Sequence, residues 1–98
     1  MTVNWHGVFP AATTQFSKDE SVNLDSTAAL IDRLILDGVH GMVVLGTVGE
    51  NCSLTAEEKR EVMRVAKSTV AGRVPLLAGV AETTTAEACR FAKDAQKI

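Results

Sequence analysis

The sequence is poor in cysteine, in excess charge and in long hydrophobic runs, and each shortage excludes a class of protein. Two cysteines among 98 residues are too few for a disulfide scaffold, and we expect both thiols to be reduced. Ten basic against twelve acidic residues lack the basic excess of a nucleic-acid-binding protein. No hydrophobic run approaches the roughly 18 residues of a membrane span. We therefore expect neither nucleic acid nor membrane as a partner.

The same shortages bear on metal binding and on location. The sequence has no C-x-x-C motif, and His6 and His40 do not lie at ligand spacing from either cysteine, so no metal site is expected. Residues 1–6 have neither the basic nor the apolar segment of a signal peptide, which predicts a cytoplasmic protein. Hydrophobic residues at 46% and charged residues at 22% are typical of a soluble chain that forms a core. Its length allows one domain at most, over residues 1–98.

Short apolar segments alternate along the chain with amphipathic segments of helix length. Strands are expected over residues 8–13, 41–46 and 74–79, the second of which has the unbroken hydrophobic character of a strand in a parallel sheet. Helices are expected to begin near Leu24, Thr55 and Thr84, where hydrophobic residues recur at helical spacing. Asn23 or Asp25 can cap the first helix, and capping boxes precede the other two. Gly38 can end the first helix in the left-handed conformation.

The predicted order is therefore three consecutive βα units, an α/β fold. Two architectures fit it: the first three βα units of a TIM (β/α)8 barrel, or a small, open, doubly wound sheet. In both, functional sites form in the loops that follow the carboxyl ends of the strands. The loops expected there begin at Thr13, Gly46 and Gly79.

The loop after the second expected strand has the most informative sequence, Gly46-Thr47-Val48-Gly49-Glu50. Glycines let a backbone turn tightly and bring its N–H groups close to an anion such as a carboxylate. The alternative is a tight turn with no ligand, since Gly-x-x-Gly alone is a weak signal. Glu50 is either a general base or, as we prefer, a hydrogen-bond anchor for the loop.

Other polar residues favour structural interpretations. Glu82 is more simply a solvated loop charge than a site carboxylate, and the pair Lys59 and Arg60 a solvated helix face. Cys52 is expected to be a small packed residue, because no histidine or cluster of cations stands beside it to activate a thiolate. Trp5 and His6 are expected to cover a strand end or a subunit contact.

These residues together resemble one known family. The chain is similar to the amino-terminal part of the dihydrodipicolinate synthase/N-acetylneuraminate lyase family, which are class I, Schiff-base-forming aldolases and lyases built on a (β/α)8 barrel. The resemblance covers essentially all 98 residues. It rests on Gly7, Thr14 with Phe16, Asp37-Gly38, Gly41, residues 46–50, Leu54-Thr55 with residues 57–59, residues 73–75, Ala78-Gly79 and residues 85–88.

The resemblance implies an enzyme that acts on pyruvate or another small 2-oxo acid. In the family, a lysine on a later strand forms an imine with the substrate, a tyrosine relays a proton, and the loop after the second strand holds the substrate carboxylate. By this likeness Thr47 is catalytic and, with the backbone of Val48, binds the carboxylate, while Gly46, Gly49 and Glu50 anchor the loop. The imine implies no metal and no diffusible cofactor. Homo-oligomers are usual in the family, so the full-length parent is expected to form one.

Several positions depart from the family pattern. A second hydroxyl residue is usual where Val48 stands, and proline is usual where Gln15 stands. The chain has no tyrosine, and none of its lysines is expected at the Schiff-base position, which would lie beyond Ile98. Two alternatives to a synthase follow: a member of the pyrroline-4-hydroxy-2-carboxylate deaminase type, or an inactive fragment or small anion-binding α/β module.

Overall fold

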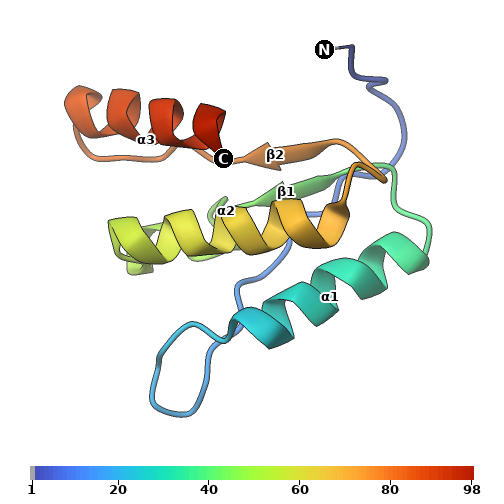
Figure 1. The fold of residues 1–98 in the computed structure, drawn as a ribbon, viewed down its shortest axis with the longest axis horizontal. Helices are drawn as coiled ribbons and strands as arrows, with labels where there is room; N and C mark the ends of the chain where they lie inside the picture. The colour runs from blue at the N-terminus through green and yellow to red at the C-terminus, as the bar shows by residue number, and fades with distance from the viewer. Residues whose placement is uncertain (1) are drawn as a thin grey trace.

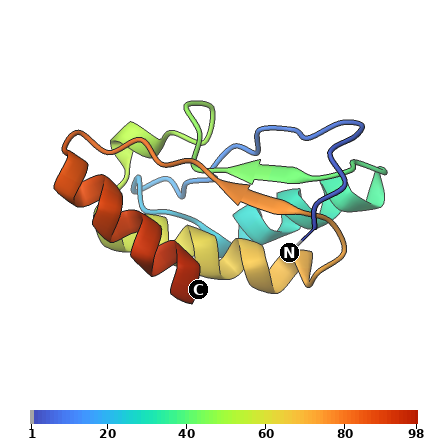
Figure 2. The ribbon, with the colours of Figure 1, turned by 90° about the horizontal axis from the view of Figure 1, so that it is seen from above.

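Strands β1 (Met42–Val44) and β2 (Leu76–Ala78) pair in parallel at the centre of the fold. The computed structural model describes residues 2–98. Met42 lies opposite Leu76, and Val44 lies opposite Ala78. The helices α1, α2 and α3 lie on one side of this pair, as the view in Figure 2 shows. Both strands therefore present one face to the helices and end at the same edge of the sheet.

The expected strand over residues 8–13 is reduced to an isolated bridge between Ala11 and Val43. This segment does run parallel to β1, because the Val43 N–H donates to Pro10 O and the Ala12 N–H donates to Val43 O. Pro10 has no N–H of its own to extend the ladder. The prediction of an α/β fold is thus confirmed, while the number of strands falls short of the three expected within residues 2–98.

The helices begin where the sequence predicts. Helix α1 (Leu24–Leu36) is capped by Asn23, which accepts from the Ser26 N–H, and Gly38 follows it in the left-handed region at φ 98°. Helix α2 (Ala56–Val70) has the full capping box of Thr55 and Glu58. In helix α3 (Thr85–Lys97) the capping box is incomplete: Thr84 accepts from the Glu87 N–H, but the Glu87 carboxylate pairs with Arg90.

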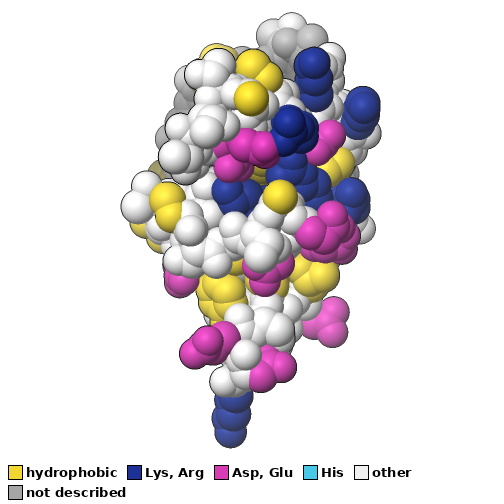
Figure 3. All heavy atoms as spheres, turned by 90° about the vertical axis from the view of Figure 1, so that its left-hand side faces the viewer, with side chains coloured by type: hydrophobic (Ala, Val, Ile, Leu, Met, Phe, Trp, Pro, Cys, Tyr) yellow, Lys and Arg dark blue, Asp and Glu magenta, His cyan; other side chains and the backbone are white. Residues whose placement is uncertain are grey.

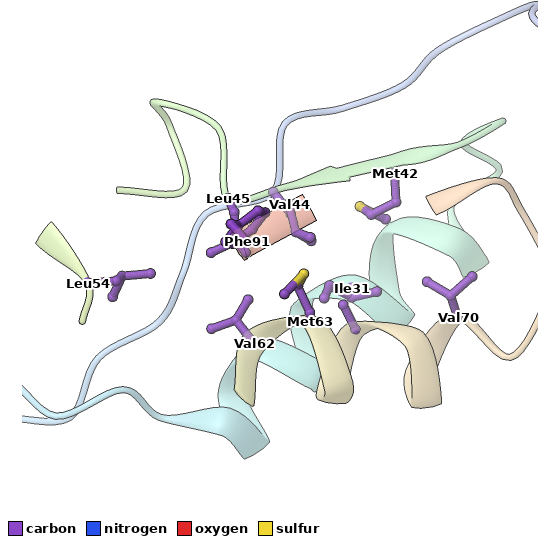
Figure 4. Close-up of a cluster of buried hydrophobic side chains, with 11 residues drawn as sticks. Ile31, Met42, Val44, Leu45, Leu54, Val62, Met63, Val70 and Phe91 are labelled. Carbon is purple, nitrogen blue, oxygen red and sulfur yellow. The ribbon is translucent and has the colours of Figure 1, made fainter. Parts of the chain in front are cut away.

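The core fills the layer between the sheet and the helices (Figure 4). Ile31, Met42, Val62 and Phe91 are almost fully buried and come from α1, β1, α2 and α3 in turn. Burying each such side chain contributes about 1.5–3 kcal/mol. One apolar layer thus holds every main element against β1 and fixes the carboxyl end of that strand.

A protruding loop precedes α1, seen in Figure 1 as the light-blue segment at the bottom of the molecule. Phe16 and Val22 form an antiparallel bridge at its base. The side-chain and backbone hydrogen bonds from Ser21 lower the pKa of the Asp19 carboxyl. Within residues 2–98, none of the helices combines the length and the hydrophobicity that crossing a bilayer would take.

Candidate functional site

The loop that follows β1 leaves the sheet through a left-handed residue, Leu45, at φ 59°. Leu45 is fully buried, so its side chain belongs to the core while its backbone turns away from the strand. A left-handed conformation costs a non-glycine residue roughly 1–2 kcal/mol. The left-handed backbone of Leu45 thus ends the strand, and the turn begins at Gly46.

Backbone N–H groups without partners gather in this turn. Within residues 2–98, the N–H groups of Gly46, Thr47, Val48 and Gly49 donate no hydrogen bond, whereas the Glu50 N–H donates to Thr47 O. Thr47 and Val48 are exposed, Val48 at 53%. Adjacent unpaired N–H groups at a turn form a concave site that favours an anion. The turn is therefore suited to a carboxylate.

Close packing explains one of the two glycines in the turn. A Cβ atom at Gly49 would lie 3.0 Å from Leu45 N and 3.2 Å from Ala12 O, whereas a Cβ atom at Gly46 would meet nothing within 4 Å. Gly79, at the end of β2, is more constrained still, because its Cβ would lie 2.4 Å from Leu45 O. The segment at Ala12, the turn at Gly49 and the end of β2 at Gly79 thus meet around the backbone of Leu45.

Two buried polar side chains anchor the turn, and the sequence did not single out either for this role. The Thr14 hydroxyl donates to Gly49 O at 2.7 Å, and the Asn51 amide donates to Leu45 O at 2.8 Å. Thr14 lies 35 residues from Gly49, so no local pattern could reveal the contact. The carboxylate of Glu50, the residue expected to anchor the loop, is exposed and makes no hydrogen bond within residues 2–98.

Lys59 is buried and forms an ion pair with the largely buried Glu82, which overturns their interpretation as solvated charges. Lys59 Nζ lies 2.8 Å from Glu82 Oε1, and the two side chains are 7% and 16% exposed. The pair ties the first turn of α2 to the loop after β2. No local pattern could indicate the pair, because the partners are 23 residues apart and lie on different elements.

Arg60 is buried as well, again contrary to expectation. Its guanidinium donates to Asp94 Oδ2 through Nε at 3.0 Å and Nη2 at 2.8 Å, and it stacks over the Phe91 ring at 5.1 Å. Figure 3 shows basic side chains lying among acidic ones on this face of the molecule, where α2 and α3 begin. The positive charges near the loop are therefore already neutralised by carboxylates of the protein.

The other residues singled out in the sequence lie away from the turn or on its surface. Cys52, in the 3-10 helix η1 (Asn51–Ser53), is exposed rather than packed. Trp5 stacks on Phe9, and His6 lies against His40, whose Nδ1 accepts from the Val8 N–H at 2.9 Å. This aromatic group stands before β1, at the opposite end of the strand from the turn. No three His, Cys, Asp or Glu side chains cluster at metal-binding distances within residues 2–98.

Comparison with known proteins points in one direction. The model of the dihydrodipicolinate synthetase family matches residues 4–98. A 4-hydroxy-tetrahydrodipicolinate synthase from Phenylobacterium zucineum is 40% identical over 94 residues, covering 96% of this chain and 32% of the relative. The chain thus spans about a third of the length of such curated relatives.

Solved structures agree with the sequence relatives. A prophage protein of the dihydrodipicolinic acid synthase family from E. coli K12, in complex with pyruvate, is 39% identical with a TM-score of 0.89, over 95% of this chain and 31% of that one. N-acetylneuraminate lyase from Mycoplasma synoviae is 33% identical with a TM-score of 0.88, over 93% of this chain and 32% of that one.

Removing the Thr14 hydroxyl should destabilise the chain. Thr14→Val keeps the shape of the side chain but leaves the buried Gly49 carbonyl without its donor, which costs about 1–3 kcal/mol. The free energy of unfolding in urea measures the loss. The matched control is Thr13→Val, whose hydroxyl lies on the surface and accepts from the Gln15 side chain. Equal stability of the two variants would contradict the anchoring role of Thr14.

The Lys59–Glu82 pair should show strong coupling. Glu82→Gln leaves the Lys59 charge buried without its counter-ion and should destabilise the chain by about 3–5 kcal/mol, whereas Glu82→Gln combined with Lys59→Met should cost much less. A double-mutant cycle on the unfolding free energy gives the coupling. Glu87→Gln is the control, because its pair with Arg90 is exposed. Additive effects of the two substitutions would show that the pair does not act as a unit.

Proposed function

Because the chain belongs to the dihydrodipicolinate synthetase family, whose members are lyases and synthases, we propose a role in Schiff-base chemistry. The chain is the amino-terminal part of an enzyme that forms an imine with pyruvate or another small 2-oxo acid, and the turn at residues 46–50 binds the substrate carboxylate. The observation that carries this proposal is the row of N–H groups without partners from Gly46 to Gly49. Pyruvate bound to the E. coli relative supports the ligand class.

The carboxylate contacts are divided among backbone and side chain. The N–H groups of Thr47 and Val48 donate to the carboxylate, and the exposed Thr47 hydroxyl can both donate and accept. Thr47 therefore orients the carboxylate and relays a proton. Val48 offers only its N–H, so one side-chain hydrogen bond usual in the family is missing here.

The remaining parts of the enzyme belong to the rest of a (β/α)8 barrel. The described residues correspond to its first three βα units, with the bridge at Ala11 in place of the first strand. The imine-forming lysine and the relay tyrosine come from later units. The parent is a cytoplasmic homo-oligomer, and no metal or diffusible cofactor is needed because the imine acts as the electron sink.

The alternatives receive less support. The curated relatives reported above carry the name 4-hydroxy-tetrahydrodipicolinate synthase, which does not favour a deaminase. A small independent anion-binding module is not favoured either. Nearly the whole chain matches these relatives, and it matches only about a third of each of them.

The 98-residue chain should bind pyruvate without forming an imine. In a titration followed by amide NMR, the N–H signals of residues 46–49 should move, because these groups are free to donate to the carboxylate. Acetone, which has the ketone but no carboxylate, is the control and should leave them in place. Borohydride added with pyruvate should leave the protein mass unchanged. If pyruvate shifted only signals of another region, the turn at residues 46–50 would not be the carboxylate site. Stoichiometric trapping at one lysine would contradict the expectation that the imine-forming lysine is not among these 98 residues.

Substitutions at Thr47 and Val48 should have opposite effects on pyruvate affinity. Thr47→Val removes a hydroxyl donor and should weaken binding roughly 2- to 10-fold, while Val48→Thr adds one and should tighten it by a similar factor. In an enzyme that joins this chain to an imine-forming lysine, Thr47→Val should also lower kcat by about 10²–10⁴. An effect on KM alone would reduce Thr47 to a binding residue.

A further inference from the structure

We infer that Asn51 is a positioning residue for the carboxylate-binding turn, acting through the peptide groups on either side of Gly46. This inference rests on the proposed function. The contacts come from both ends of the same residue: the Asn51 side-chain amide donates to Leu45 O at 2.8 Å, and the Asn51 backbone N–H donates to Gly46 O at 3.3 Å. Asn51 is 1% exposed, so water competes little for either bond.

These two bonds set the direction of two neighbouring N–H groups. In a trans peptide the C=O and N–H point in opposite directions. With Leu45 O and Gly46 O directed at Asn51, the N–H groups of Gly46 and Thr47 point away from it. These two groups belong to the set without partners. Asn51 therefore turns two successive carbonyls inward and leaves two N–H groups for an anion.

The Leu45 carbonyl is confined from a second direction. A Cβ atom on Gly79 would lie 2.4 Å from Leu45 O, so the end of β2 packs directly against this carbonyl. The peptide group after Leu45 is held between Gly79 and Asn51, and the left-handed φ of Leu45 is the conformation that places it there. Asn51 supplies the only side-chain hydrogen bond to this carbonyl within residues 2–98.

Asn51 is poorly suited to a purely stabilising role. Its Oδ1 is buried and has no hydrogen-bond partner within residues 2–98. A buried acceptor without a donor is unfavourable, so the Asn51 amide gains the hydrogen bond to Leu45 O at the cost of an unpaired oxygen of its own. The net gain in stability from this side chain is therefore small, and its main effect is the conformation that it imposes on the turn.

The unmodified chain gives the first test. Its Leu45 should show the strong intraresidue Hα–HN nuclear Overhauser effect of a positive φ, and the side-chain amide protons of Asn51 should exchange slowly with solvent. Asn4, which is exposed, is the control for side-chain amide exchange. Fast exchange at Asn51, or a weak effect at Leu45, would overturn the inference without any substitution.

Asn51→Leu gives the second test, because it keeps the size of the side chain and removes its donor. We expect the folded variant to lose the positive-φ signature of Leu45 and to bind pyruvate about tenfold more weakly. Cys52→Ser, an exposed position in the same turn of η1, is the matched control and should retain both properties. An Asn51→Leu variant that keeps the Leu45 signature and full pyruvate affinity would refute the positioning role.

The two readouts separate this inference from the proposed function. If the unmodified chain shows the Leu45 signature but its 46–49 signals do not respond to pyruvate, the carboxylate site fails. The effect of Asn51→Leu on the Leu45 signature then decides the positioning role alone. If pyruvate binds and Asn51→Leu changes nothing, the site stands and the positioning role fails.

Discussion

The candidate site depends on the peptide group between Leu45 and Gly46. The Leu45 side chain is locked in the core, its φ is left-handed, and its carbonyl lies between Gly79 and Asn51. Because the buried side chain cannot shift without opening the core, the backbone must make the whole change of direction at one residue. The packing of the Leu45 side chain in the core thereby fixes the direction of the N–H groups that follow.

The helices and the loop sequence could be predicted because their signals are local. Helix α2 has its hydrophobic face at helical spacing and its capping box within four residues, and both are present in the structure. In the strand expected over residues 8–13, Pro10 interrupts the pattern of donors that a ladder needs. Its segment nevertheless lies beside β1, so the α/β order was predictable where the strand bounds were not.

The polar contacts that the sequence does not reveal join residues far apart along the chain. Charged residues are usually solvated, so Lys59 and Arg60 looked like a surface pair. Their partners, Glu82 and Asp94, lie 23 and 34 residues away, and only the packing of the loop and α3 against α2 brings them together. The same holds for Thr14 and Gly49. Polar residues that form hydrogen bonds or ion pairs with distant segments produce no periodic pattern in a single sequence.

The two glycines of the turn are equal in the sequence motif but unequal in the molecule. Gly49 is held against the backbone of Leu45 and Ala12, whereas Gly46 faces open space and has no positive φ. Alanine or serine at position 46 would therefore meet no neighbouring atom within residues 2–98, whereas any side chain at position 49 would press on the backbone of Leu45 and Ala12. The two glycines thus answer to different constraints, and packing within this part of the chain sets only the second.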